Sequence, residues 1–170
     1  MKRILAFVGD LYEDLELWYP KIRLQEAGHE VVLAGLEAGR TYHGKKGIPC
    51  RAQAAVSEVD PEAYDALLVP GGFMPDRLRR EASVLQIVRR MDAAGRAIAF
   101  ICHGGWILIS AGILQGRRAT STRAIRDDMV NAGCLWSDEP LVIDGNLISS
   151  RNPGDLHHFA LALVEHLQLA

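Results

Sequence analysis

The sequence has no apolar run close to the roughly 20 residues that a membrane-spanning helix requires. Its first apolar run, residues 4–8, is also too short for a secretory signal peptide. The three cysteines, Cys50, Cys102 and Cys134, form no CxxC pair and are too few for a secreted disulfide framework. We therefore expect a soluble, cytoplasmic protein with reduced thiols and no membrane partner.

An excess of positive charge is absent as well. The 19 Lys and Arg residues are outnumbered by 21 Asp and Glu residues, whereas a domain that binds nucleic acid usually carries a basic surplus. The chain has neither a Walker loop nor a dinucleotide-binding glycine motif, so no cofactor is predicted. The adjacent His157 and His158 point to different faces of a helix and have no acid or cysteine at ligand spacing, so no metal site is predicted.

The composition is that of one globular domain: 170 residues, of which 49% are hydrophobic and 24% charged. Short apolar runs alternate with segments of helical periodicity, which predicts an α/β fold with a mainly parallel sheet and helices on both faces. The turn sequence Asp144-Gly145-Asn146 predicts a hairpin. Buried strands are expected at residues 4–8, 29–34, 66–69 and 97–101, and short strands within the irregular residues 39–59. Helices are expected from residue 83 to near residue 95 and from about residue 154.

The segment after the first strand predicts an amphipathic helix. Leu15, Trp18, Ile22 and Ala27 follow the spacing of three and four residues that such a helix requires. Pro20 lies inside this pattern, so we expect a kink or a restart of the helix there.

Three segments at the ends of predicted strands contain the candidate chemistry: residues 9–13, 70–76 and 102–105. In an open parallel sheet, ligands bind just beyond the carboxyl ends of the strands. Because the three segments follow three different strands, we expect them to meet in one crevice.

Cys102 is the strongest candidate for a reactive group. It directly follows the strand at residues 97–101, and Gly104 and Gly105 permit the sharp bend of a nucleophile elbow. The positive end of the next helix and an imidazolium at His103 would both lower the pKa of the thiol. The alternative, from the pattern alone, is an inert buried cysteine.

Backbone amides and acids near these strand ends supply possible partners. The N–H groups of Gly72 and His103 could form an oxyanion hole, although a plain strand-ending turn would also explain the glycine. A carboxyl could lie against the sulfur or orient the imidazole, and the pattern leaves both roles open. The candidate acids are Asp10, Glu13, Asp14 and Asp76.

Five motifs occur in order along nearly the whole chain: Glu13-Asp14-Leu15-Glu16 through Tyr19-Pro20, Pro70-Gly71-Gly72 with Pro75-Asp76, Ile101-Cys102-His103-Gly104, Ile125-Arg126-Asp127-Asp128, and Asp144-Gly145-Asn146 through Ser150-Arg151. With these motifs the sequence resembles the PfpI intracellular protease family, of the class I glutamine-amidotransferase-like group. The resemblance implies a single PfpI-like domain over residues 1–170, folded as a flavodoxin-like three-layer sandwich with a nucleophile elbow.

The resemblance also implies roles for individual residues. Cys102 would be the nucleophile with His103 as its partner, Glu13 would sit against the sulfur, and Gly72 and His103 would form the oxyanion hole. In family members the acid at the position of Asp76 reaches the histidine of a neighbouring subunit. A homo-oligomer is therefore implied, either a dimer or a hexameric assembly of dimers.

The sequence departs from the family pattern at positions around the implied pocket. Phe73 replaces a basic residue, Asp76 is shorter than the glutamate of some members, and Thr122 replaces an aromatic residue. Gly105 replaces a proline, and Phe100 is bulkier than the usual residue. These changes leave the nucleophile intact and alter its surroundings.

Two main hypotheses follow. The first is a stress-related cysteine hydrolase that acts on glyoxal- or methylglyoxal-derived protein adducts or on peptides, so that its substrate is a small molecule or a protein. The second is a redox-sensing or chaperone-like stress protein whose Cys102 is oxidised and does not turn over. A third possibility is a non-catalytic interaction scaffold.

Overall fold

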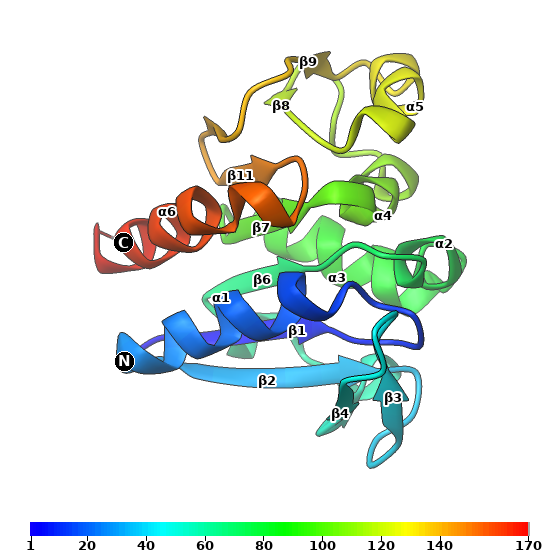
Figure 1. Cartoon of the computed structure of the whole chain (residues 1–170), viewed down its shortest axis with the longest axis vertical. Coiled ribbons are helices and arrows are strands. Elements are labelled where there is room, and N and C mark those ends of the chain that lie inside the picture. The colour runs from blue at the N-terminus through cyan, green and yellow to red at the C-terminus, as the bar shows by residue number, and fades with distance from the viewer. Residues whose placement is uncertain (170) are drawn as a thin grey trace.

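A seven-stranded sheet runs through the molecule in the computed structural model, which describes residues 1–169 (Figure 1). The strand order is β10-β11-β7-β6-β1-β2-β5, in which β10 pairs antiparallel with β11 and the other neighbours are parallel. The strands are β1 (Arg3–Phe7), β2 (Glu30–Gly35), β5 (Ala54–Ala55), β6 (Ala66–Val69), β7 (Ala97–Ile101), β10 (Val142–Asp144) and β11 (Leu147–Ser150).

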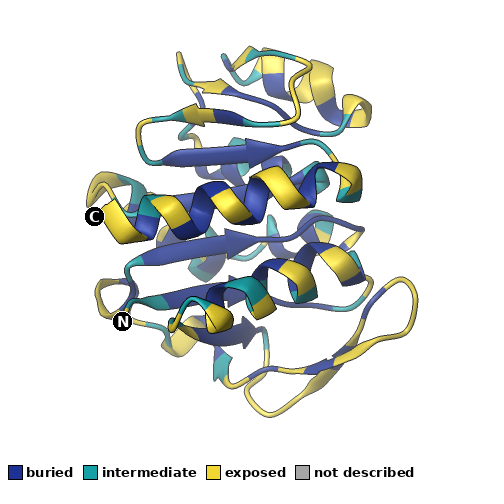
Figure 2. Ribbon diagram, turned by 60° about the vertical axis from the view of Figure 1, so that its left-hand side comes forward, coloured by how far each residue is buried: buried dark blue, intermediate teal, exposed yellow. Residues whose placement is uncertain are grey.

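Helices cover both faces of this sheet. On one face α1 and α6 pack against each other, and on the other α3 packs against β6, β7 and α4 (Figure 1). Figure 2 shows the strands buried and the helices exposed along their outer sides. No helix within residues 1–169 is long and apolar enough to cross a membrane. The helices are α1 (Asp14–Glu26), α2 (Met74–Leu78), α3 (Ala82–Ala93), α4 (Gly105–Ala111), α5 (Arg126–Asn131) and α6 (Leu156–Leu169).

This architecture confirms the predicted α/β fold with a mainly parallel sheet. The central strands are fully buried because they are covered on both faces, which explains their continuous apolar runs. The predicted hairpin forms between β10 and β11, with Asp144 opposite Leu147. The irregular residues 39–59 contain β5 and an outlying antiparallel hairpin of β3 (Thr41–His43) and β4 (Pro49–Arg51).

The predicted apolar side of the first helix was half right: Trp18 and Ala27 pack against the core, but Leu15 and Ile22 do not. α1 runs without interruption through Pro20, and its buried side contains Glu16, Leu17 and Leu24. Leu15 and Ile22, which defined the predicted apolar pattern, are 54% and 48% exposed. The buried stripe includes a carboxylic acid and a proline, so a search for apolar periodicity alone selects only part of the buried side.

Candidate active site

The predicted elbow forms at the end of β7. Cys102 has a φ of +62°, a backbone conformation that is uncommon and strained for residues other than glycine. The chain then makes a single 3₁₀ turn, Cys102–Gly104, before α4 begins. A side chain at Gly104 would lie 2.7 Å from the carbonyl oxygen of Val69. The glycine therefore allows the elbow to fold back against β6.

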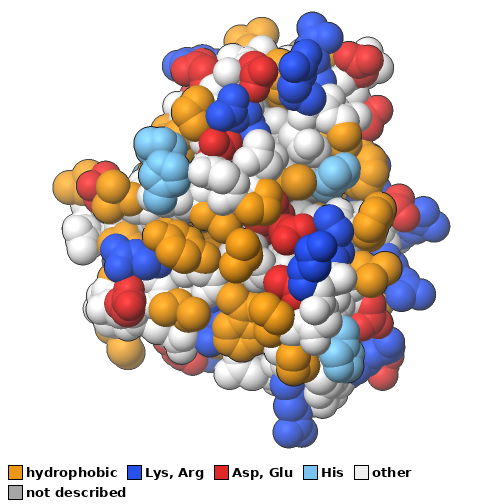
Figure 3. All heavy atoms as spheres, viewed as in Figure 1, with side chains coloured by type: hydrophobic (Ala, Val, Ile, Leu, Met, Phe, Trp, Pro, Cys, Tyr) orange, Lys and Arg blue, Asp and Glu red, His pale blue; other side chains and the backbone are white. Residues whose placement is uncertain are grey.

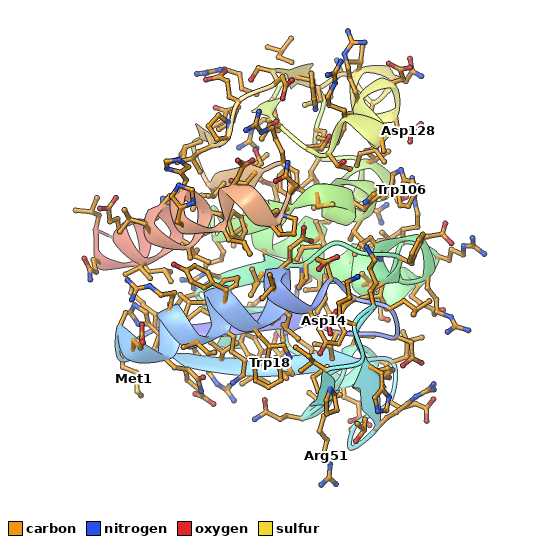
Figure 4. The ribbon with its side chains drawn as sticks, in the orientation of Figure 1. Met1, Asp14, Trp18, Arg51, Trp106 and Asp128 are labelled. Atoms are coloured by element: carbon orange, nitrogen blue, oxygen red, sulfur yellow. The ribbon has the colours of Figure 1, made fainter. Side chains whose placement is uncertain are left out.

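The sulfur of Cys102 contacts the imidazole of its neighbour. Cys102 Sγ lies 3.3 Å from Nδ1 of His103. On its other side, the His103 ring lies 5.0 Å from the ring of Trp106, whose Nε1 donates a 2.9 Å hydrogen bond to Asp128 (Figure 4). Burial and the charge of Lys45 lower the pKa of His103. The imidazole is therefore neutral at neutral pH, and the predicted imidazolium was wrong.

Two backbone amides converge on the sulfur. The N–H groups of His103 and Gly72 both donate hydrogen bonds to Cys102. Gly72 has a φ of +80°, and a side chain there would overlap the carbonyl oxygen of Leu11 and the backbone nitrogen of Glu13. The conformation and the close approach together require glycine. The structure thus brings the two predicted donors to the sulfur of Cys102.

The carboxyl beside the sulfur belongs to Glu16, whereas the resemblance implied Glu13. Glu16 is fully buried, its Oε2 accepts a 2.8 Å hydrogen bond from the N–H of Gly71, and its carboxyl interacts with the Cys102 thiol. Its other oxygen, Oε1, is buried without a hydrogen-bond partner among residues 1–169. Oε1 is therefore the oxygen available to hold a proton.

Burial disfavours a negative charge on either of the two acidic groups, Glu16 and Cys102. Burial raises the pKa of Glu16 to about 8, so this carboxyl is protonated at neutral pH. Burial and the charge of Glu16 raise the pKa of Cys102 to about 12, although the two backbone N–H groups lower it. The predicted lowering of the thiol pKa was wrong, because burial and Glu16 outweigh the two backbone N–H groups. The resting site therefore contains a thiol and a carboxylic acid.

Glu13 lies at the mouth of the site instead. Its Oε2 accepts a 3.0 Å hydrogen bond from the ammonium of Lys45, and its backbone N–H donates to the carbonyl oxygen of Gly71. Lys45 Nζ also lies 5.6 Å from the ring centroid of Phe73, which is 63% exposed. Figure 3 shows acidic and basic side chains together at the centre of this face, with hydrophobic side chains around them.

The other candidate acids have partners away from the sulfur. Asp76 pairs with Arg80 one turn further along the chain, at 2.8 Å, and no interaction between Asp76 and His103 occurs within residues 1–169. Asp10 pairs with Arg40 at 3.0 Å. Asp14 accepts backbone N–H groups from the β3–β4 turn. The contact of Asp76 with a neighbouring subunit stays a prediction.

The comparison with known proteins decides the family. A family model described as the DJ-1/PfpI family matches residues 2–166. The chain belongs to the DJ-1/PfpI family. This confirms the resemblance, and the flavodoxin-like sandwich is the fold of related DJ-1/PfpI structures.

Individual members of the DJ-1/PfpI family match nearly the whole chain. Deglycase PfpI of Pyrococcus furiosus is 46% identical over 166 residues, which cover 98% of this chain and 99% of the relative. Protein/nucleic acid deglycase 2 of Escherichia coli is 38% identical, with 93% of each chain covered. A crystal structure from Anabaena variabilis, of a protein with DJ-1/ThiJ/PfpI-like and ferritin-like domains, matches with a TM-score of 0.97 and 38% identity over 99% of this chain and 48% of that one. These relatives are consistent with the predicted cysteine-dependent hydrolase.

Sequence reasoning missed Glu16 and Lys45. Glu16 lies on the same helical stripe as Pro20 and Leu24, four and eight residues later, so an apolar pattern through Leu17 and Leu24 would have placed it on the buried side. Lys45 lies in the irregular excursion, and no local pattern in the sequence connects it with Cys102.

Proposed function

We propose that this chain is a cysteine hydrolase that removes glyoxal- or methylglyoxal-derived adducts from proteins, with peptide bonds as alternative substrates. One observation carries the proposal: the sulfur of Cys102, at the tip of the elbow, meets a neutral imidazole, a carboxyl and two N–H donors. The deglycase names of the relatives at 46% and 38% identity support the adducts as the first choice.

In the addition step, the sulfur of Cys102 forms a bond to the carbonyl carbon. Its proton passes to Nδ1 of His103, 3.3 Å away, and the π electrons of the carbonyl move onto the oxygen. The N–H groups of Gly72 and His103 stabilise this oxygen. Because the thiol starts protonated, proton transfer accompanies the attack, and a neutral His103 is the suitable acceptor.

Protonated Glu16 keeps a second negative charge away from the sulfur. An ionised carboxylate at this position would oppose the developing thiolate, whereas a carboxylic acid can donate a hydrogen bond to it. Peptide hydrolysis requires a further step from the same groups, because the leaving amine must also be protonated. His103 is adjacent in sequence to Cys102, so it is not well placed to protonate that amine. This difference favours adducts over unmodified peptides.

The test is turnover of three substrates side by side: a methylglyoxal-modified amino acid, free methylglyoxal and a peptide. We expect the wild type to act on the modified amino acid, and the Cys102→Ser variant to lose about a thousandfold or more of this activity, because a nucleophile acting with its base is removed. Full activity in Cys102→Ser would refute the proposal.

The redox-sensor alternative requires a readily ionised thiol. Burial raises the pKa of Cys102, so the reactive thiolate is scarce at neutral pH for oxidation and for nucleophilic attack alike, and the pKa does not choose between the two functions. Titration with peroxide separates the two functions. Rapid oxidation of Cys102 in a protein that turns over none of the three substrates would favour the sensor.

We further propose a homo-oligomer, in the cytoplasm, with a stress-related role. Exposed apolar side chains support the assembly: Leu15 and Ile22 on α1 and Leu161 on α6. The three cysteines, all free thiols, fit a reducing compartment. If Asp76 completes a neighbouring site, mixed oligomers of Cys102→Ser and Asp76→Asn chains will recover activity that neither variant shows alone, and no recovery would argue against sharing.

A further inference from the structure

Lys45 is fixed over the mouth of the site by the β3–β4 turn. Its backbone N–H donates a 2.9 Å hydrogen bond to the carbonyl oxygen of Tyr12. The carboxylate of the buried Asp14 accepts hydrogen bonds from the backbone N–H groups of Lys46 and Ile48, at 2.8 and 2.9 Å. Figure 4 shows Asp14 at the start of α1, next to this turn. The backbone that carries Lys45 is therefore held against α1.

The ammonium of Lys45 stays accessible to solvent in this position. The side chain of Lys45 is 36% exposed, whereas that of its partner Glu13 is 14% exposed. Glu13 accepts one hydrogen bond from Nζ, at 3.0 Å. An ammonium group has three N–H donors, so Nζ can donate to an incoming group while it stays bound to Glu13.

The charge of Lys45 reaches the reacting groups. The ammonium lies within electrostatic range of Cys102 and Glu16 when either is ionised, and it lowers the pKa of His103 in addition to the effect of burial. The carboxylate of Glu13 raises the pKa of Lys45 and so keeps the ammonium charged. With Glu16 protonated, a molecule approaching the thiol meets the more exposed positive partner of the Lys45–Glu13 pair first.

We infer that Lys45 is a specificity-determining residue that draws electrophiles bearing a carboxylate or another anionic group to Cys102. The substrate class would be carbonyl compounds that carry such an anionic group close to the electrophilic carbon. The exposed ring of Phe73, beside the ammonium, provides an apolar wall for the rest of the molecule. This inference deepens the proposed function, since it concerns the selectivity of the same thiol.

Alkylation of Cys102 tests the inference without relying on turnover. Iodoacetate is anionic and iodoacetamide neutral, and in both reactions the sulfur displaces iodide as the new S–C bond forms. The ratio of their second-order rate constants at Cys102, followed by mass spectrometry, measures the preference for an anionic electrophile. Effects on the ionisation of the thiol apply to both reagents and cancel in this ratio.

Lys45→Met should lower the iodoacetate-to-iodoacetamide ratio about five- to tenfold at low salt, because a unit charge near the sulfur is lost. Lys45→Arg should keep most of the wild-type ratio. Lys46→Met is the matched control: Lys46 is the exposed neighbour in the same turn, and removing its side-chain charge should change the ratio less than twofold. Glu13→Gln should raise the ratio, because it removes the negative partner of Lys45.

Salt gives a second readout. The ratio should fall with ionic strength in the wild type and stay nearly constant in Lys45→Met. An unchanged ratio in Lys45→Met, or an equal fall in Lys46→Met, would overturn the inference. Failure of the hydrolase proposal looks different, because Cys102 would then show the charge preference in alkylation but no turnover of any substrate.

Discussion

The site has a buried floor and a solvent-accessible rim, and their acidic side chains differ in burial and in their partners. The floor is formed by Glu16, Gly71, Gly72 and Cys102. The rim is formed by Glu13, Lys45 and Phe73. On the floor, Glu16 is fully buried and bonded to a backbone N–H, and it is protonated at neutral pH. On the rim, Glu13 forms an ion pair with Lys45, whose side chain reaches solvent.

This difference shows that the protonation state of a carboxyl depends on its burial more than on its position in the sequence. Glu13 and Glu16 are three residues apart at the start of α1, and their carboxyls interact electrostatically with each other. Only the buried Glu16 is protonated at neutral pH, because desolvation penalises its ionised form. The floor therefore provides a neutral hydrogen-bonding environment for the sulfur, and the rim provides charge.

The largest expected effect is that of Glu16→Gln on the pH dependence of stability. The unfolded chain ionises Glu16 near pH 4.5, whereas the folded protein holds the proton until about pH 8. Raising the pH through this window therefore favours unfolding of the wild type. Relative to Glu16→Gln, the wild type should lose on the order of 4 kcal/mol between pH 4.5 and pH 8 and no more above that, since one pKa unit corresponds to about 1.4 kcal/mol.

Urea denaturation of both proteins at several pH values between 4 and 9 measures this difference. Glutamine keeps the shape of the side chain and an acceptor for the N–H of Gly71, so the two proteins should be close in stability at the acid end of the range. Parallel stability curves over the whole range would mean that Glu16 is ionised in the folded protein. The distinction between floor and rim would then fail.

A smaller effect is expected for Gly72→Ala, which disturbs the floor through the backbone. The positive φ and the overlap with Leu11 and Glu13 should cost roughly 2–3 kcal/mol of unfolding free energy. Activity should fall about a hundredfold, because the proposed oxyanion donor is displaced. Gly112→Ala is the matched control: Gly112 has a φ of +75° and no atom within 4 Å of the added Cβ, so it reports the backbone strain alone. Equal costs in stability and activity for the two variants would contradict a close-packed floor.

The sequence predicted the floor better than the rim, for a physical reason. The elbow depends on local features, an apolar strand followed by Cys102 and two glycines, which appear in consecutive residues. The donor at Gly72 also follows directly from the end of a strand. The parallel sheet then brings these strand ends together, so local patterns were sufficient for Cys102, His103 and Gly72.

The identity of the acid and the protonation states were not predictable in this way. The choice between Glu13 and Glu16 depends on the rotation of α1, and the apolar residues at positions 15 and 22 indicated the wrong side. The pKa of Cys102 depends on the depth of burial, which no short motif encodes. Lys45 reaches the site through the β3–β4 turn, whose position is set by contacts of Asp14 with residues more than 30 positions away.

The smallest expected effect is that of Glu13→Gln on stability. The Lys45–Glu13 pair lies at the surface, and exposed ion pairs contribute about 0–1 kcal/mol. We expect a loss below about 1 kcal/mol at pH 7 and low salt, decreasing further at high salt as the charges are screened. Urea denaturation at two salt concentrations measures it. A loss of several kcal/mol that persists in high salt would show that Glu13 is held as rigidly as Glu16, so that rim and floor form one buried network.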